Sequence, residues 1–304
     1  MTAKTQRRSG RRALRGAQPY LLLLPALAIV AAFFAYPVAK AVQLSFMQYV
    51  LFEPDDIGFA GLLNYRELLA DSNLPLILRN SLVWVVATVG LQFALGFALA
   101  LALYVKFRGK NVYQAIVFLP WAVSAFLIGM IFKWMFNEQG GLVNYALLQL
   151  GLADKAIPFL AIPYASIVPV ILAMVWYGVP FFGIMILAAL QSVPHEMLEA
   201  ADIDGAGRVR KLFDIIVPYI KPTLILTVLL RVIWVFNSAD LIYIMTNGGP
   251  ANSSHNLPSY TFNQISYSAD FGQASALGVV MLLILTLYTV FFLRVTKYKE
   301  AGDI

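Results

Sequence analysis

The sequence predicts an all-α integral membrane protein that crosses the bilayer six times. Of its 304 residues, 60% are hydrophobic and only 12% are charged, whereas a soluble domain carries about 25% charged residues. Six stretches also reach the length of about 20 apolar residues that a helix needs to cross hydrocarbon. A helix satisfies its own backbone groups where no water is available. The bilayer is therefore the solvent that this composition requires.

The six spans are expected at residues 19–46, 77–105, 113–136, 164–190, 223–245 and 272–294. The first could be a cleaved signal peptide, because a basic region precedes an apolar one. Its apolar character continues through residues 31–38, however, and five further spans follow. We therefore expect one transmembrane domain, residues 19–295, between a basic arm at 1–18 and a tail at 296–304.

Basic residues predict the orientation of these spans. They gather in the arm, between spans two and three, between spans four and five, and after span six: Lys4, Arg7, Arg8, Arg11, Arg12, Arg15, Lys106, Arg108, Lys110, Arg208, Arg210, Lys211, Lys221, Arg294, Lys297 and Lys299. The opposite loops carry only two basic residues, Arg66 and Lys155, beside eight acids: Glu53, Asp55, Asp56, Glu67, Asp71, Glu138, Asp154 and Asp270. Basic loops remain in the cytoplasm, so both termini are expected there. This distribution also favours anionic lipid over nucleic acid as the reason for the net charge of +6.

Several kinds of chemistry find no support in the sequence. The chain has no cysteine, which excludes disulfides and thiolate metal sites. It has no glycine-rich G-x-x-x-x-G-K-[ST] loop for nucleotide phosphates. Its two histidines, His195 and His255, are isolated, and we expect both in solvated loops. We therefore predict no catalytic residue, no metal site and no cofactor.

The cytoplasmic loop at residues 191–222 is longer than a connector needs to be. Pro194 can begin a helix, and Glu196 and Glu199 lie near its amino end, where the helix dipole favours acids. Gly205 can end it in a left-handed conformation. Small or apolar residues repeat along one face: Met197, Ala200 and Ala201. A second amphipathic segment is expected at 209–217, ending at Pro218. The pattern fits either an interfacial helix or a docking helix for a cytoplasmic partner.

A family resemblance favours the docking helix. The loop carries a long motif: Glu199-Ala200-Ala201, Asp204-Gly205-Ala206, Phe213, Ile216, Pro218 and Pro222. This motif resembles the EAA loop of bacterial ABC importer permeases, with Val217 where leucine is commoner. The resemblance implies the type I permease fold and a coupling helix that contacts a separate ATPase subunit. The contact residues that it implies are Glu199, Ala200, Ala201, Asp204 and Gly205.

Three further motifs extend this resemblance to the larger permeases of carbohydrate importers. They are Phe59-Ala60-Gly61-Leu62-Leu63-Asn64-Tyr65, Phe118-Leu119-Pro120-Trp121 and Thr246-Asn247-Gly248-Gly249-Pro250. The last of them is also a tight-turn composition that should end a helix sharply.

Spans four and five carry the residues best suited to contact a sugar, which stacks on aromatic rings and bonds to fixed polar groups. Gly178 and Pro180 should disrupt span four, and Arg231, Trp234 and Ser238 should share one stripe of span five. A charge at that depth should face the passage or a partner acid, and Asp240 lies on the wrong side of the helix to be that acid. Similarity to the larger permeases of maltose importers implies these substrate contacts: Trp121, Met174, Trp176, Tyr177, Gly178, Phe181, Arg231 and Trp234. Those permeases have an amide at Met174 and a hydroxyl at Arg231, which argues against maltose itself.

The resemblance implies a non-enzymatic permease in the bacterial cytoplasmic (inner) membrane. Its partners would be a second homologous permease, a dimer of ATPase subunits and an extracytoplasmic solute-binding protein, with a carbohydrate as cargo. A sugar acid or a glycerol phosphate-like anion is an alternative cargo because of Arg231. An ion-driven secondary transporter and a membrane anchor without cargo are further alternatives. The first would need buried acids or histidines, for which Asp240 offers little.

Overall fold

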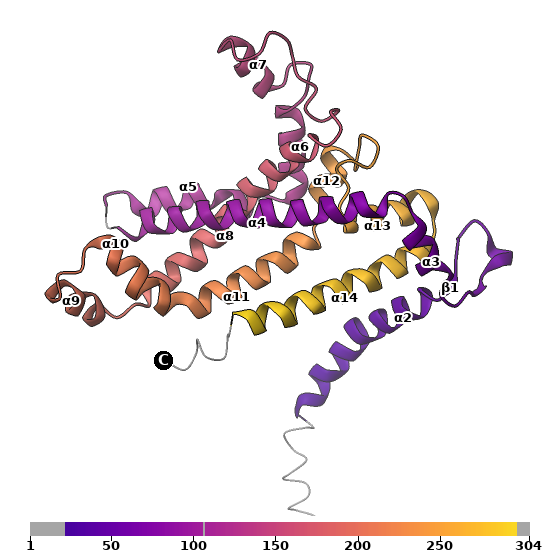
Figure 1. Ribbon diagram of the computed structural model, residues 1–304, viewed down its shortest axis with the longest axis horizontal. Coiled ribbons are helices and arrows are strands. Elements are labelled where there is room, and N and C mark those ends of the chain that lie inside the picture. The colour runs from indigo at the N-terminus through magenta and orange to yellow at the C-terminus, as the bar shows by residue number, and fades with distance from the viewer. Residues whose placement is uncertain (1–21, 106, 297–304) are drawn as a thin grey trace, which may run out of the picture.

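The computed structural model describes residues 22–105 and 107–296, and it is built mainly from long apolar helices (Figure 1). Five helical segments are long and apolar enough to cross a membrane: Leu22–Leu44, Leu74–Tyr104, Ile167–Gln191, Arg208–Met245 and Phe271–Val295. A sixth span is present if the bent pair Lys110–Ala122 and Ala125–Met135 counts as one. Each corresponds to one predicted span. The predicted arm and most of the predicted tail lie outside the described residues.

The third span is the one that departs most from the prediction. A straight helix was expected over 113–136, but α5 (Lys110–Ala122) and α6 (Ala125–Met135) meet at an angle of 93°. Pro120 lies inside the last turn of α5, where it cannot donate a backbone hydrogen bond. Ser124 then caps α6 by accepting from the backbone N of Leu127. The chain therefore ends one helix and begins another within the span.

The fifth span begins earlier than predicted and is interrupted near its end. Helix α10 (Arg208–Lys211) continues through the π-helical turn η3 (Leu212–Ile216) into α11 (Val217–Phe236). The wider turn, with the backbone N of Val217 bonded to Leu212 O, lets the helix pass Pro218 instead of ending there. The short α12 (Asp240–Met245) follows a break. Ser238 lies in that break, so it does not continue the stripe of Arg231 and Trp234 along α11.

Helices α4 (Leu74–Tyr104), α8 (Ile167–Gln191) and α11 form the centre of the molecule. The main buried apolar cluster is shared among them, with Trp84, Phe182 and Ile186 fully enclosed. Helix α14 (Phe271–Val295) packs on α2 (Tyr36–Leu44) and beside a smaller cluster around Leu257 and Leu277. The apolar window of the first span, which includes the turn η1 (Ala31–Ala35), buries no residue inside the chain. Its apolar surface is therefore exposed to whatever surrounds this chain.

Short elements cover the two ends of the long helices (Figure 1). Helices α9 (His195–Ile203) and α10 lie at one end, and α3 (Leu63–Ala70), β1 (Met47–Gln48) and α13 (Leu257–Asn263) lie at the other. β1 pairs antiparallel with β2 (Gly58–Phe59). The remaining short elements are η2 (Pro54–Asp56), α7 (Leu142–Gln149) and η4 (Gln264–Ser268).

The connection between α12 and α13 is a buried polar loop. Asn247 and Gly248 have positive φ angles of 48° and 77°, which confirms the predicted sharp helix end. The loop is held by side chains of distant helices, with Asn80 Nδ2 donating to Ser253 O at 3.0 Å and Ser166 Oγ donating to Gly249 O at 3.0 Å. This end of the molecule is therefore tied together by hydrogen bonds.

The prediction that His255 is solvated is wrong, because it lies inside this loop with 2% of its surface exposed. Its Nδ1 lies 2.9 Å from Ser259 Oγ, and its Nε2 lies 3.0 Å from Asn263 Nδ2. Burial lowers the pKa of His255 to about 4. Ser259 and Asn263 provide hydrogen-bond partners for both ring nitrogens, which offsets the cost of burying the ring. Spacing in the sequence does not reveal this network. His195, at the start of α9, is exposed as predicted.

Candidate translocation site

Four of the predicted cargo residues, Trp121, Phe181, Arg231 and Trp234, come together where α5, α8 and α11 meet. Phe181, on α8, is the centre: its ring centroid lies 6.1 Å from that of Trp121 and 5.2 Å from that of Trp234. The guanidinium carbon of Arg231 lies 5.4 Å from the same centroid. This arrangement places an aromatic surface and a cation side by side, the combination that stabilises both partners.

Arg231 is held by a glutamine of the same chain. Its Nε donates to Gln92 Oε1 at 2.7 Å, and Gln92 Nε2 donates to Met174 O at 2.5 Å. Arg231 and Gln92 are 2% and 0% exposed. Three long helices, α4, α8 and α11, are thus linked at one level. In this conformation Arg231 contacts Gln92 and Phe181, and it forms no ion pair with any residue that the structure describes.

Gly178 makes this close approach possible. A Cβ atom at this position would lie 2.0 Å from Arg231 Nη2 and 2.1 Å from Gln92 Nε2. Both distances are far inside van der Waals contact, so no other residue fits without displacing the linked side chains. The aromatic neighbours of Gly178 thus surround a point where α8 presents bare backbone to the other two helices.

The tryptophans lie at the edge of this site. Trp121, Trp176 and Trp234 are 44%, 46% and 49% exposed, whereas Phe181 is 5% exposed. Trp176 packs on Phe132 of α6 at 5.8 Å between ring centroids. Tyr177 is half-buried and Met174 is buried. We call these eight predicted residues the aromatic site; its buried floor is Phe181 and Arg231, and its open rim is the three indoles.

The predicted docking helix is present as α9, although nothing in the chain alone tests its role. It begins after Pro194 and ends before Gly205, whose φ is 73°. Lys211 forms an ion pair with Asp202, which connects α9 to the next helix. Of the five predicted contact residues, Glu199, Ala200, Asp204 and Gly205 are exposed and Ala201 is buried.

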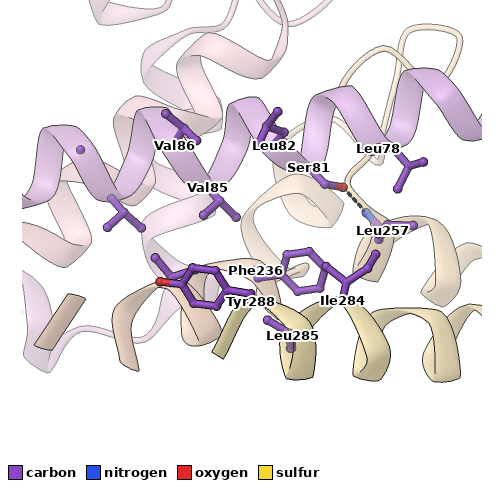
Figure 2. Close-up of a pocket in the computed structure, with 13 residues that line it drawn as sticks. Leu78, Ser81, Leu82, Val85, Val86, Phe236, Leu257, Ile284, Leu285 and Tyr288 are labelled. Atoms are coloured by element: carbon purple, nitrogen blue, oxygen red, sulfur yellow. Dashed lines mark hydrogen bonds between the residues drawn. The ribbon is translucent and has the colours of Figure 1, made fainter. Parts of the chain in front are cut away.

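A separate cavity between α4, α11, α13 and α14 contains none of these residues (Figure 2). Its volume is about 380 Å³, and Leu78, Val85 and Ile284 are among its mostly aliphatic lining residues. Its one serine, Ser81, already accepts from the backbone N of Leu257 at 2.9 Å. A sugar needs several fixed polar partners, so this cavity is a poor site for cargo.

Motif reasoning missed Gln92 and Phe132, which contact residues of the aromatic site. Phe132 carried no distinguishing signal among many span aromatics. Gln92 did carry one, because a glutamine in the middle of an otherwise apolar span needs a polar partner.

Comparison with known proteins agrees with this fold. Residues 92–300 match the family model described as "Binding-protein-dependent transport system inner membrane component". A trehalose/maltose transport system permease protein of Thermococcus litoralis is 31% identical over 281 residues, covering 92% of this chain and 94% of the relative. A sulfoquinovosyl glycerol transport system permease protein of Agrobacterium fabrum is 32% identical over 280 residues, covering 92% and 90%.

A solved structure shares the architecture. A subunit of a bacterial ABC transporter involved in the import of the acidic polysaccharide alginate superimposes with a TM-score of 0.81. The two chains are 22% identical, and the match covers 95% of this chain and 98% of the other. The likeness confirms the predicted type I permease fold. The relatives are transport subunits, which confirms the prediction of a non-enzymatic protein. The chain belongs to the family of inner membrane components of binding-protein-dependent transport systems, the permease subunits of ABC importers.

Proposed function

We propose that this permease forms half of the translocation path of a sugar importer and that the aromatic site contacts the cargo. The observation that carries the proposal is that two half-exposed indoles, Trp121 and Trp234, pack on Phe181, whose ring also contacts the buried guanidinium of Arg231. Indole faces stack on the apolar faces of sugar rings, and fixed polar groups select hydroxyls. The printed names of the two relatives, with trehalose/maltose and sulfoquinovosyl glycerol as cargo, support a carbohydrate.

The proposed assembly has four kinds of partner. A second, homologous permease completes the path and covers the three indoles, which are about half exposed in this chain. A dimer of ATPase subunits binds at the end that carries α9, and an extracytoplasmic solute-binding protein delivers cargo at the opposite end. The distribution of basic residues supports a cytoplasmic location of α9 and of both termini, in a cell with a bacterial-type inner membrane. Family membership excludes the ion-driven alternative.

The proposed mechanism is alternating access driven from outside the chain. ATP-dependent closure of the ATPase dimer moves α9 through Glu199, Ala200, Ala201, Asp204 and Gly205. The ion pair between Lys211 and Asp202 connects α9 to the helix that continues into α11. Movement of α9 therefore reaches Arg231 and Trp234 through one continuous helical segment. The chain itself makes and breaks no covalent bond.

Two substitutions test the cargo role in the reconstituted importer with its binding protein. Trp176→Ala and Trp234→Ala should abolish sugar uptake while leaving the complex assembled, because both indoles lie at the rim and not in the core. Tyr145→Ala, an exposed aromatic on α7, is the control. Full uptake by both tryptophan variants would favour the anchor without cargo.

The absence of cysteine in the chain allows a clean test of coupling. A single Ala200→Cys permease should crosslink to the ATPase subunit in intact membranes, whereas Leu152→Cys, exposed in the opposite loop, should not. If Ala200→Cys never captures the ATPase, α9 is not the coupling helix.

An anionic cargo, such as a sugar acid or a glycerol phosphate-like molecule, is the second candidate. Arg231 Nη2 is buried and has no hydrogen-bond partner among the described residues. A buried charge without compensation costs several kcal/mol, and an anionic cargo group would remove that cost. Arg231→Met should then abolish uptake of the acidic sugar and spare that of its neutral analogue.

A further inference from the structure

A second cavity outside the aromatic site also has the composition of a sugar site. It lies between α6, α12 and α13 and has a volume of about 900 Å³, within the range of about 300–1,000 Å³ of small-molecule sites. We call it the outer pocket. Its lining residues are Ala125, Phe126, Met130, Lys133, Trp134, Asn137, Ala239, Asp240, Tyr243, Ile244 and Phe262. None of them belongs to the aromatic site.

Aromatic rings form the apolar part of the outer pocket. Trp134 and Phe126 are exposed on α6, and Tyr243 and Phe262 pack edge-to-face at 4.8 Å between ring centroids. The edge-to-face pair fixes both rings, so their remaining surfaces are presented at little entropic cost. Rings held in this way can stack on the apolar face of a sugar.

Polar groups of three kinds converge on the same cavity. Lys133 Nζ donates to Ile244 O at 2.9 Å, which fixes the ammonium group on the wall formed by α12. Asp240 begins α12 with its side chain exposed, and Asn137 follows α6. Within the described part of the chain, neither Lys133 nor Asp240 forms an ion pair. A carboxylate, an amide and an ammonium group together can donate to and accept from several hydroxyls.

A groove in a membrane protein can also be filled by lipid chains or by a second permease. The mixture of rings and charged groups in the outer pocket argues against both. Lipid chains offer nothing to a lysine, an aspartate or an asparagine, and charges facing lipid are costly. A permanent interface with a second permease would be depleted in charged residues at its centre. A ligand rich in hydroxyl groups satisfies both the rings and the charges.

The outer pocket is connected to the aromatic site through α6. Phe132 packs on Trp176 of the aromatic site, while the neighbouring residues Met130, Lys133 and Trp134 line the outer pocket. The bend before α6 gives the helix this position between the two. Under the orientation proposed above, the outer pocket lies on the extracytoplasmic side, where cargo arrives first.

We propose that the outer pocket binds a carbohydrate unit of the cargo on its way from the solute-binding protein to the aromatic site. The proposal rests on the sugar-importer function. Transfer of a sugar between two sites is easier when the second set of aromatic and polar partners lies close to the first. Here α6 contributes residues to the outer pocket and contacts the aromatic site through Phe132.

Thiol protection in the assembled importer tests the outer pocket. Asn137→Cys places a thiol in its lining, and Glu138→Cys places one on the exposed neighbouring residue outside it. Both are treated with a membrane-impermeant maleimide, with trehalose, maltose or mannitol present. Uptake of the same three compounds by the importer without a cysteine is measured in parallel. Ala239→Cys, in the lining from α12, replaces Asn137→Cys if that variant does not assemble.

We expect the sugar that is taken up to slow labelling of the pocket thiol and leave Glu138→Cys unaffected. At about ten times the half-saturating concentration, occupancy should slow labelling about tenfold. Trp134→Ala should raise the half-saturating concentration for uptake, with Tyr145→Ala as control. Equal labelling with and without a sugar that is taken up would overturn the outer pocket alone. A thiol that the assembled partner shields without sugar would assign the cavity to the permease interface. If the importer takes up neither of these sugars nor any other sugar offered with its binding protein, the proposed function fails first and the outer pocket falls with it.

Discussion

Replacing Gln92 by leucine should loosen the centre of the permease. Gln92→Leu keeps the size and the apolar surroundings but removes the acceptor of Arg231 Nε and the donor to Met174 O. A buried charged donor left without its partner costs about 1.5–3 kcal/mol. One kcal/mol shifts the unfolding temperature of a chain of roughly this size by about 2–4 °C. We therefore expect the apparent unfolding temperature of the purified importer to fall by roughly 3 to 12 °C.

A double-mutant cycle identifies the cause of this loss. Arg231→Met removes the group that Gln92 serves, so Gln92→Leu should cost much less when it is added to Arg231→Met than when it is made alone. We expect a coupling of about 1 kcal/mol or more, measured from thermal unfolding of the four proteins in nanodiscs. Gln149→Leu, on the exposed end of α7, controls for the general effect of the exchange. Costs that add to within about 0.5 kcal/mol would refute the link between the two side chains.

Three other changes test separate parts of the structure. Gly178→Ala should lower stability by about 1–3 kcal/mol and abolish uptake, because its Cβ would overlap the guanidinium of Arg231 and the amide of Gln92. Gly90→Ala is the control: it has open space around its Cβ and should do neither. The pKa of His255 falls from 6.5 to about 4 on folding, so the unfolded chain binds the proton more tightly. The free energy of unfolding should therefore decrease as the pH falls from 6.5 towards 4. His255→Gln should remove this part of the acid sensitivity in thermal scans. Tyr260→Phe removes the 2.5 Å hydrogen bond to Asp71 and should cost about 1.5–3 kcal/mol, whereas an unchanged unfolding temperature would show that water replaces the bond.

Most of the fold could be predicted from the sequence because bilayer thickness imposes a simple rule. Five of the six predicted stretches overlap one long apolar helical segment each, and the third overlaps the bent pair α5 and α6. Local chemistry was equally informative at α9, where Pro194 and Gly205 limit the helix as predicted. The bend after Pro120 was not predicted, because a proline near a helix end is compatible with either a kink or a break. In this chain the helix breaks, and α6 packs against α12.

The polar contacts between helices could not be predicted in the same way. The aromatic site was predicted by resemblance, and the structure brings Trp121, Trp234 and Arg231 together around Phe181, whereas Trp176 packs on Phe132 of α6. The partner of Arg231, however, lies 139 positions away in sequence, and no helical period relates two different helices. The prediction that His255 is solvated was wrong for the same reason, because its burial depends on a loop folded against Asn80 and Ser166. Buried polar groups are determined by tertiary neighbours, whereas spans are determined by local composition.

The burial of the aromatic site also determines what one chain can do. Small-molecule sites usually bury about 70–90% of their ligand, but the indoles of Trp121, Trp176 and Trp234 are each about half exposed in this chain. Phe181 and Arg231 supply a rigid floor without a second wall. A sugar on this surface would keep much of its own area in water, so its contacts would offset little of the entropy lost on binding. A complete site therefore requires a second surface opposite the indoles, which explains why a permease of this kind would act as one half of a pair.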